Sequence, residues 1–205
     1  MIGVALPQKK CDIIAVQPAL ANPLGDGKSY GSTNYTRATA PHAARWQGEG
    51  YLQMDFLKTI TAGFGGTAFM SILMSFIHRS GWANADMVRA LGSLVTRRSE
   101  NALVPGLLVH FVSGIFFAFP YTFIISGLGL PSVTSSLGVG SLLGFAHGVA
   151  MSFILLAVMS EKHPLPQFQE AGIDVGVAHI AGHVFYGAGV GIIAGALGLD
   201  YGFRF

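Results

Sequence analysis

The chain has 205 residues, of which 51% are hydrophobic and only 11% are charged, and its formal net charge is +2. Soluble domains carry about 25% charged residues, so a composition with a mean hydropathy of +0.54 all but excludes a water-soluble globular enzyme. The weak positive charge gives no reason to expect nucleic acid as a partner. The composition predicts an all-α integral membrane protein that contacts the lipid bilayer and binds lipids.

Residues 1–53 differ from the rest of the chain. Proline, glycine, serine and asparagine interrupt this stretch every few residues, so no long helix or strand is expected, and no cleavable signal is recognised. The single cysteine, Cys11, excludes an intrachain disulfide and a cysteine-rich metal site. We predict an irregular polar extension that docks on a partner, with folding back onto its own helices as the alternative. Its candidate partner-binding residues are Tyr30, Tyr35, Trp46 and Tyr51.

Four apolar segments follow in residues 54–205, at about 57–77, 103–128, 137–159 and 175–197. Each is close to the ~20 residues that a helix needs to cross about 30 Å of hydrocarbon. Continuous apolar stretches lack the alternation of barrel strands, so helices are the expected spanning form. The sequence therefore predicts a four-helix transmembrane bundle behind an irregular N-terminal tail.

A short amphipathic segment lies between the first two predicted spans, at about residues 84–97. Met87, Leu91, Leu94 and Val95 recur at helical spacing, and Asn84 could cap the start of a helix. We predict a short interfacial helix that lies on the membrane surface.

Positive charge is distributed unevenly between the two sides of the predicted bundle. The loops after the first and third spans carry Arg79, Arg89, Arg97, Arg98 and Lys162, whereas Arg45, Lys58 and Arg204 lie close to the bilayer on the other side. Cytoplasmic loops are enriched in lysine and arginine. This predicts that the loop at 78–102 is cytoplasmic and that both termini lie outside.

Glycines recur every four residues along the third and fourth predicted spans. They are Gly140, Gly144 and Gly148, then Gly187, Gly191 and Gly195. In lipid, small residues promote helix association because they let two backbones approach closely. We predict that these stripes pack helices, either within the bundle or against another subunit.

Two pairs of segments resemble each other within the chain. Residues 66–73 resemble residues 148–155, and residues 110–114 resemble residues 183–187, in the same order in both halves. This pattern is consistent with a duplicated helical hairpin.

Three Gly-rich motifs, at residues 62–70, 109–114 and 182–188, resemble a family of small, uncharacterised bacterial four-helix membrane proteins. The resemblance covers about residues 56–197 and leaves the N-terminal tail outside. It implies a four-span bundle in the bacterial inner membrane, and it implies no particular activity.

Four histidines are the only ionisable residues well inside the predicted spans: His110, His147, His179 and His183. Ionisable groups at such positions are candidate functional residues. Their neutral rings could hydrogen-bond across helices, form a proton path, or bind a macrocycle. A haem would lie between His110 and His183, whereas a chlorophyll, with or without carotenoid, would need one imidazole. His179 and His183 share a helix face but lack a third ligand, so no metal site is predicted.

Recognisable catalytic motifs are missing: the sequence has no phosphate-binding loop, no HExxH and no GxSxG. We therefore predict no enzyme and no catalytic residues. The sequence favours a non-catalytic accessory subunit that packs against other integral membrane subunits of a larger complex, for instance a photosynthetic or respiratory one. The alternatives are a small haem- or (bacterio)chlorophyll-binding membrane protein, and a small transporter or channel.

Overall fold

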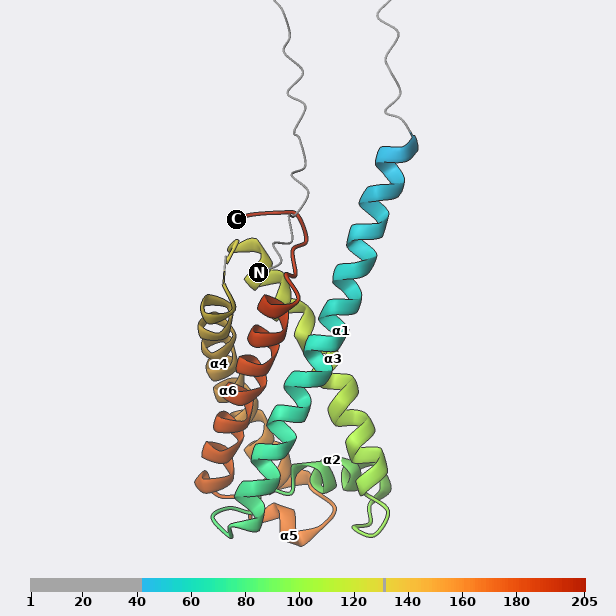
Figure 1. Ribbon diagram of the computed structural model, residues 1–205. Coiled ribbons are helices and arrows are strands. Elements are labelled where there is room, and N and C mark those ends of the chain that lie inside the picture. Colours follow the sequence, from blue (N-terminus) through green and yellow to red (C-terminus); the bar gives the residue numbers. More distant parts are fainter. Residues whose placement is uncertain (1–41, 131) are drawn as a thin grey trace, which may run out of the picture. The chain divides into compact units, whose positions relative to one another are not determined.

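The computed structural model describes the backbone of residues 42–130 and 132–205, and the side chains of residues 55–130 and 132–205. These residues form helices and connecting loops, without a strand (Figure 1). The helices are α1 (His42–Arg79), α2 (Met87–Thr96), α3 (Leu103–Gly127), α4 (Val133–Lys162), α5 (Pro166–Gln169) and α6 (Ile173–Ala196).

Four of these helices are long and apolar enough to cross a membrane, namely Asp55–Arg79 of α1 and the whole of α3, α4 and α6. The all-helical architecture with four candidate spans is thereby confirmed. The predicted first span, 57–77, lies within the candidate span Asp55–Arg79. The expectation of no long helix in residues 1–53 is wrong for residues 42–53, because α1 begins at His42. Pro41 is the last proline before this helix, and the glycines that follow it weaken a helix by only about 1 kcal/mol each. The remaining predictions for the N-terminal extension fall outside the described residues.

The short helix α2 packs against protein, and its placement on the membrane surface stays a prediction. A Cβ atom added at Gly92 would collide with the carbonyl oxygen of Ala102, and one at Gly106 would collide with that of Val88. The backbones of α2 and α3 therefore touch, because glycine stands at each crossing point. Met87, from the predicted apolar face, is buried within the protein.

The boundaries and exposed face of α2 differ from the prediction. Asp86, not Asn84, caps the helix, since its carboxylate accepts the backbone N–H of Arg89 at 3.2 Å. Asn84 instead donates its amide to the carbonyl oxygen of Gln167. Val95 is 66% exposed, so it does not belong to the buried face.

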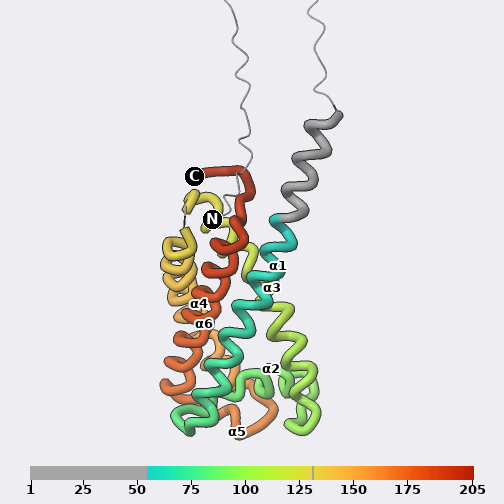
Figure 2. The backbone as a smooth tube through the Cα atoms, viewed as in Figure 1, coloured from blue at the N-terminus to red at the C-terminus, as the bar shows by residue number. Residues whose placement is uncertain are grey.

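The four long helices pack as an open series in the order α4, α6, α1, α3. Helix α6 contacts α4 on one side and α1 on the other, and α1 in turn contacts α3 (Figure 2). Helices α3 and α4, at the two ends of the series, barely touch each other. The predicted hairpin pairs, α1 with α3 and α4 with α6, are thus in contact, and the duplication stays a prediction.

Helices α4 and α6 are joined by glycine. All six glycines of the two predicted stripes lie at this contact: Gly140, Gly144, Gly148, Gly187, Gly191 and Gly195. A Cβ atom added at Gly140 would collide with the carbonyl oxygen of Gly187, and one added at Gly187 would collide with the carbonyl oxygen of Gly140. Both stripes therefore serve close packing within this chain.

Candidate functional site

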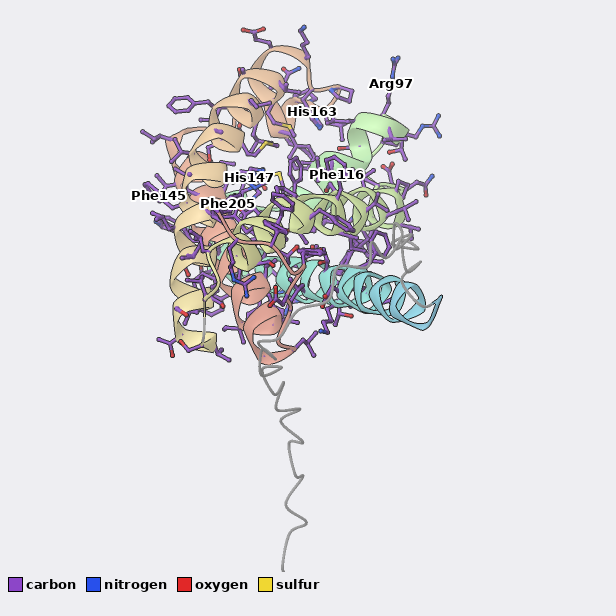
Figure 3. The ribbon with its side chains drawn as sticks, turned by 90° about the horizontal axis from the view of Figure 1, so that it is seen from above. Arg97, Phe116, Phe145, His147, His163 and Phe205 are labelled. Atoms are coloured by element: carbon purple, nitrogen blue, oxygen red, sulfur yellow. The ribbon has the colours of Figure 1, made fainter. Side chains whose placement is uncertain are left out.

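Four histidines from three helices line one cavity of ≈ 270 Å³: His110 of α3, His147 of α4, and His179 and His183 of α6. The rest of the lining is largely apolar and includes Met70, Met87, Met151, Met159 and Phe117. Figure 3 shows His147 on the inner side of α4, whereas Phe145, two residues earlier, points outward. All four histidines that the sequence singled out thus meet at one place.

Local packing explains how these side chains come together. His179 and His183 are one helical turn apart and therefore share a face of α6. Gly144 and Gly148 of α4 lie against the backbone and Cβ of His183, which brings α4 close. As a result, the ring centroids of His147 and His183 are 4.5 Å apart, and those of His179 and His183 are 4.7 Å apart.

The histidines form only part of the hydrogen bonds that their rings can make. The Nε2 atoms of His179 and His183 are 3.2 Å apart, and Nδ1 of His147 lies 3.1 Å from the Tyr121 hydroxyl. Three buried ring nitrogens have no partner, namely Nε2 of His147 and Nδ1 of both His179 and His183. A neutral imidazole has one donor and one acceptor, and leaving a buried polar atom unpaired costs about 1–3 kcal/mol. The cavity therefore has hydrogen-bonding capacity for a ligand.

Three hydroxyl groups at the cavity already donate to backbone oxygens. Thr67 donates to Gly63 at 2.7 Å, Ser113 to His110 at 3.0 Å, and Tyr186 to Gly114 at 2.6 Å. The ring nitrogens of the histidines are therefore the main groups left for recognition.

The cavity opens between α3 and α4. Of its lining residues, Val109 of α3 and Ile154 and Val158 of α4 are exposed, by 40%, 55% and 37%. This is the gap left by the sparse contact between the two helices. At one end of the cavity, α2 contributes Met87, Leu91 and Leu94 to the lining. The apolar face of α2 therefore covers the cavity.

A second cavity of ≈ 290 Å³ lies among α1, α2 and α3 and is also lined by His110. Its lining is more polar and includes Ser71, Ser75, His78, Arg79, Asp86 and Arg89. His110 and Met87 line both cavities.

The cavity is small compared with a macrocycle. Pockets for drug-sized ligands are about 300–1,000 Å³, and a haem or chlorin is larger than most such ligands. In addition, Nε2 of His183 already faces Nε2 of His179, so His183 cannot bind an iron through that atom without losing this contact. Among the described residues, no group of three or more histidine, cysteine, aspartate or glutamate side chains is arranged to hold a metal ion.

Sequence reasoning missed the contribution of Tyr121 to the site. Tyr121 follows His110 by eleven residues, which is close to three helical turns, so the spacing could have placed both on one face of α3. The residues predicted to bind a partner are not tested: Tyr30 and Tyr35 lie outside the described residues, and the side chains of Trp46 and Tyr51 are not described.

Comparisons with curated proteins and with solved structures give no match. A family model, in contrast, matches residues 54–200, a region that contains all four candidate spans and the histidine cavity. It begins after residues 1–53, as the resemblance noted in the sequence implied. The chain therefore belongs to a family of unknown function, DUF6789.

Proposed function

We propose that this protein is a multi-pass membrane protein that binds a lipid-soluble small molecule in the histidine cavity. The observation that carries the proposal is the set of three unpaired ring nitrogens in an apolar cavity. Native proteins leave few buried polar atoms unpaired, so such a cluster calls for a partner that supplies hydrogen bonds.

The opening of the cavity supports a ligand that arrives through lipid. In a bilayer, the gap between α3 and α4 faces sideways into the hydrocarbon, because both helices are candidate spans. Its exposed rim consists of Val109, Ile154 and Val158, which favour an apolar ligand. A water-soluble ligand would have no reason to enter by this route.

The ligand class that suits these features best is a quinone. Its ring carries carbonyl or hydroxyl oxygens that can pair with imidazole donors and acceptors. The ring is flat enough to pack against Phe117, and a cavity of ≈ 270 Å³ accommodates a small ring more readily than a macrocycle. The isoprenoid tail would leave between α3 and α4 into the lipid.

The predicted accessory-subunit role rested on the glycine stripes and on the N-terminal extension. The stripes are used between α4 and α6, and the extension falls outside the described residues. That role stays a prediction, as does transport, and neither conflicts with a bound ligand. An accessory subunit with a ligand site of its own would combine the two.

Binding can be tested with the full chain in lipid nanodiscs, using a benzoquinone with a short alkyl tail as the probe. Ile154→Trp should fill the opening, and His147→Leu should remove one recognition nitrogen; each is expected to weaken binding about tenfold, equivalent to about 1.4 kcal/mol. The matched control is Ile72→Trp, because Ile72 is 72% exposed on α1 and outside the cavity.

Two results would overturn the proposal. One is that the native protein neither binds the probe nor carries any lipid-soluble molecule that solvent extraction and mass spectrometry detect. The other is that the probe binds but Ile154→Trp and His147→Leu leave its affinity unchanged, since the site would then lie elsewhere.

A further inference from the structure

His110 stands between two cavities of different character. On one side it lines the apolar cavity that holds His147, His179 and His183. On the other side it lines the second cavity, among α1, α2 and α3. Its side chain is buried, with 8% exposure, and it is in contact with both cavities.

The second cavity can hold water. Its polar lining includes Ser71 and Ser75 of α1, and its outer part includes His78 and Arg79, which are exposed at the end of that helix. At ≈ 290 Å³ it is far larger than the roughly 30 Å³ that one water molecule occupies in the liquid. Polar side chains and adequate volume are the two conditions for a hydrated cavity.

We propose that His110 passes protons between the water of the second cavity and the histidine cluster. Protons would then reach the cluster from the end of the bundle where the loops at 80–86 and 163–172 lie. The inference deepens the proposed function and rests on it in one respect: the protonation of a bound quinone would follow the pH on that side.

The transfer is balanced within the imidazole ring. One ring nitrogen of His110 accepts a proton from hydronium in the second cavity, which leaves water, and the other ring nitrogen releases its own proton to an unprotonated ring nitrogen of the cluster. Rotation or back-exchange restores the original tautomer, so no oxidant or reductant is needed. The cationic intermediate is short-lived because the apolar cavity stabilises a charge poorly.

The acceptors on the inner side are present. Nδ1 of His179 and Nδ1 of His183 are buried without a partner in the cavity that His110 lines. His183 in turn lies against His147, whose Nδ1 is next to the Tyr121 hydroxyl. Protons that pass His110 can therefore be exchanged between His179 and His183, whose Nε2 atoms are 3.2 Å apart.

Charged and titratable groups from four helices line the two cavities together with His110. They are His78 and Arg79 of α1, Asp86 at the start of α2, Arg89 of α2, His147 of α4, and His179 and His183 of α6. Asp86 is paired with Arg89 at 3.3 Å, which leaves Arg79 as an exposed cation at the outer end. The positive charge of Arg79 opposes a persistent positive charge on His110, because like charges repel. His110 would therefore transfer protons and not retain them.

The test uses ligand-free protein in nanodiscs with ring-¹⁵N-labelled histidine. After transfer to D₂O, the loss of the imidazole N–H signals of His147, His179 and His183 is followed by NMR. His110→Leu removes the relaying nitrogens, and Ser75→Leu fills the second cavity without touching the cluster. Each is expected to slow exchange about tenfold. Ser160→Leu, at an exposed site on α4 outside both cavities, should leave exchange unchanged.

Unchanged exchange in both variants would overturn the proposal. Slow exchange in His110→Leu together with normal exchange in Ser75→Leu would overturn the claim that protons reach His110 through the second cavity. Backbone NMR spectra establish that each variant is folded, and Ser75 is exposed, so its replacement should not affect folding. Because no ligand is present, this result and the quinone-binding result can fail independently.

Discussion

One histidine outside the cavity, His163, holds α2 in place. Its side chain is 1% exposed, with Nε2 lying 3.1 Å from the carbonyl oxygen of Ala90 and Nδ1 accepting the backbone N–H of Leu165 at 3.1 Å. A neutral ring protonated at Nε2 satisfies both contacts. Figure 3 shows His163 beside α2, so this residue links the loop after α4 to the helix that covers the cavity.

Replacing His163 with alanine should therefore loosen α2. The N–H of Leu165 would lose its acceptor, at a cost of about 1–3 kcal/mol, and the carbonyl oxygen of Ala90 would keep only Ser93 as a side-chain donor. Thermal unfolding in mild detergent would measure the effect. His78→Ala serves as control because His78 is exposed, and equal destabilisation by the two substitutions would contradict the assigned role.

At the C-terminal end, Asp200 and Arg204 form a two-pronged ion pair, with N–O distances of 2.8 and 2.9 Å. The Arg204 guanidinium, helped by the backbone N–H of Gly202, holds the pKa of Asp200 well below its usual range. Beyond this pair, the N–H of Phe205 donates to the carbonyl oxygen of Gly127 at 3.0 Å. The pair thus helps keep the last residues folded against α3.

The lowered pKa of Asp200 predicts how this segment responds to pH. The stabilising effect of the ionised Asp200 carboxylate is fully present above the usual pKa of an aspartate. It is lost as the pH falls through the lower pKa that Asp200 has in the folded protein. Hydrogen exchange of residues 200–205, normalised to intrinsic rates, should therefore rise only in strong acid. Asp200→Asn should give fast exchange at neutral pH, and unchanged exchange there would refute the prediction.

At the scale of elements, the contact between α4 and α6 depends on the absence of side chains. Gly140 and Gly187 meet backbone to backbone, so a methyl group at either position cannot be accommodated by moving a side chain. Gly138, on the same helix α4, has nothing within 4 Å of an added Cβ. Alanine at Gly140 therefore tests the effect of close packing, and alanine at Gly138 tests the effect of helix propensity alone.

Gly140→Ala should destabilise the folded protein by about 1–3 kcal/mol, the usual range for overpacking. Gly138→Ala should be neutral or stabilising by up to about 1 kcal/mol, because alanine favours a helix more than glycine does. Unfolding in mixed detergent, followed by circular dichroism, measures both. Similar values for the two variants would show that α4 and α6 are not joined by this close contact.

At the scale of the whole molecule, the open helix series explains why a cavity exists. Three extensive helix contacts, α4 with α6, α6 with α1, and α1 with α3, leave α3 and α4 with only sparse contact, made in part by Tyr121 against His147. Figure 1 shows α2 and α5 near one end of these helices, where the loops of 80–86 and 163–172 also lie. The two ends of the bundle, along the helix axes, therefore differ, and the second cavity lies at the end that carries α2.

Orientation in the membrane is testable on the whole chain. The charge distribution predicts a cytoplasmic loop at 78–102, so Glu100→Cys should be protected from a membrane-impermeant maleimide in intact cells and Thr134→Cys should be labelled. Both positions are exposed in the structure. A Cys11→Ser background removes the natural thiol. The reverse labelling pattern would show that the protein has the opposite orientation.

Several features could be read from residue order because they depend on local pattern. Long apolar segments ended by polar or proline-containing loops gave four helices whose bounds fall within a few residues of the structure, apart from the start of α1. Glycine every fourth residue indicated close helix packing, and four isolated histidines indicated a site. Each of these signals lies on a single helix and needs no knowledge of its neighbours.

Other features depend on which helices touch. The glycine stripes and the internal repeat favoured packing of α4 on α6. Nothing local showed that α3 and α4 would make so little contact, so the opening between them could not be predicted. The turn from α1 into α2 places Met87 inside the protein, whereas the apolar spacing of α2 equally suits a helix on a membrane surface. His163, in a loop, gave no sign of its contact with Ala90, seventy-three residues away.

The sequence by itself therefore determined the helical class, the candidate spans and the identity of the four histidines, since hydrophobic length and polarity are properties of each segment. Only the tertiary structure decided that these histidines meet, that three of their nitrogens are unpaired, and that His110 lies between two cavities. The physical reason is that burial and hydrogen-bond pairing belong to contacts between helices, and glycine at the crossing points sets which of those contacts can be made.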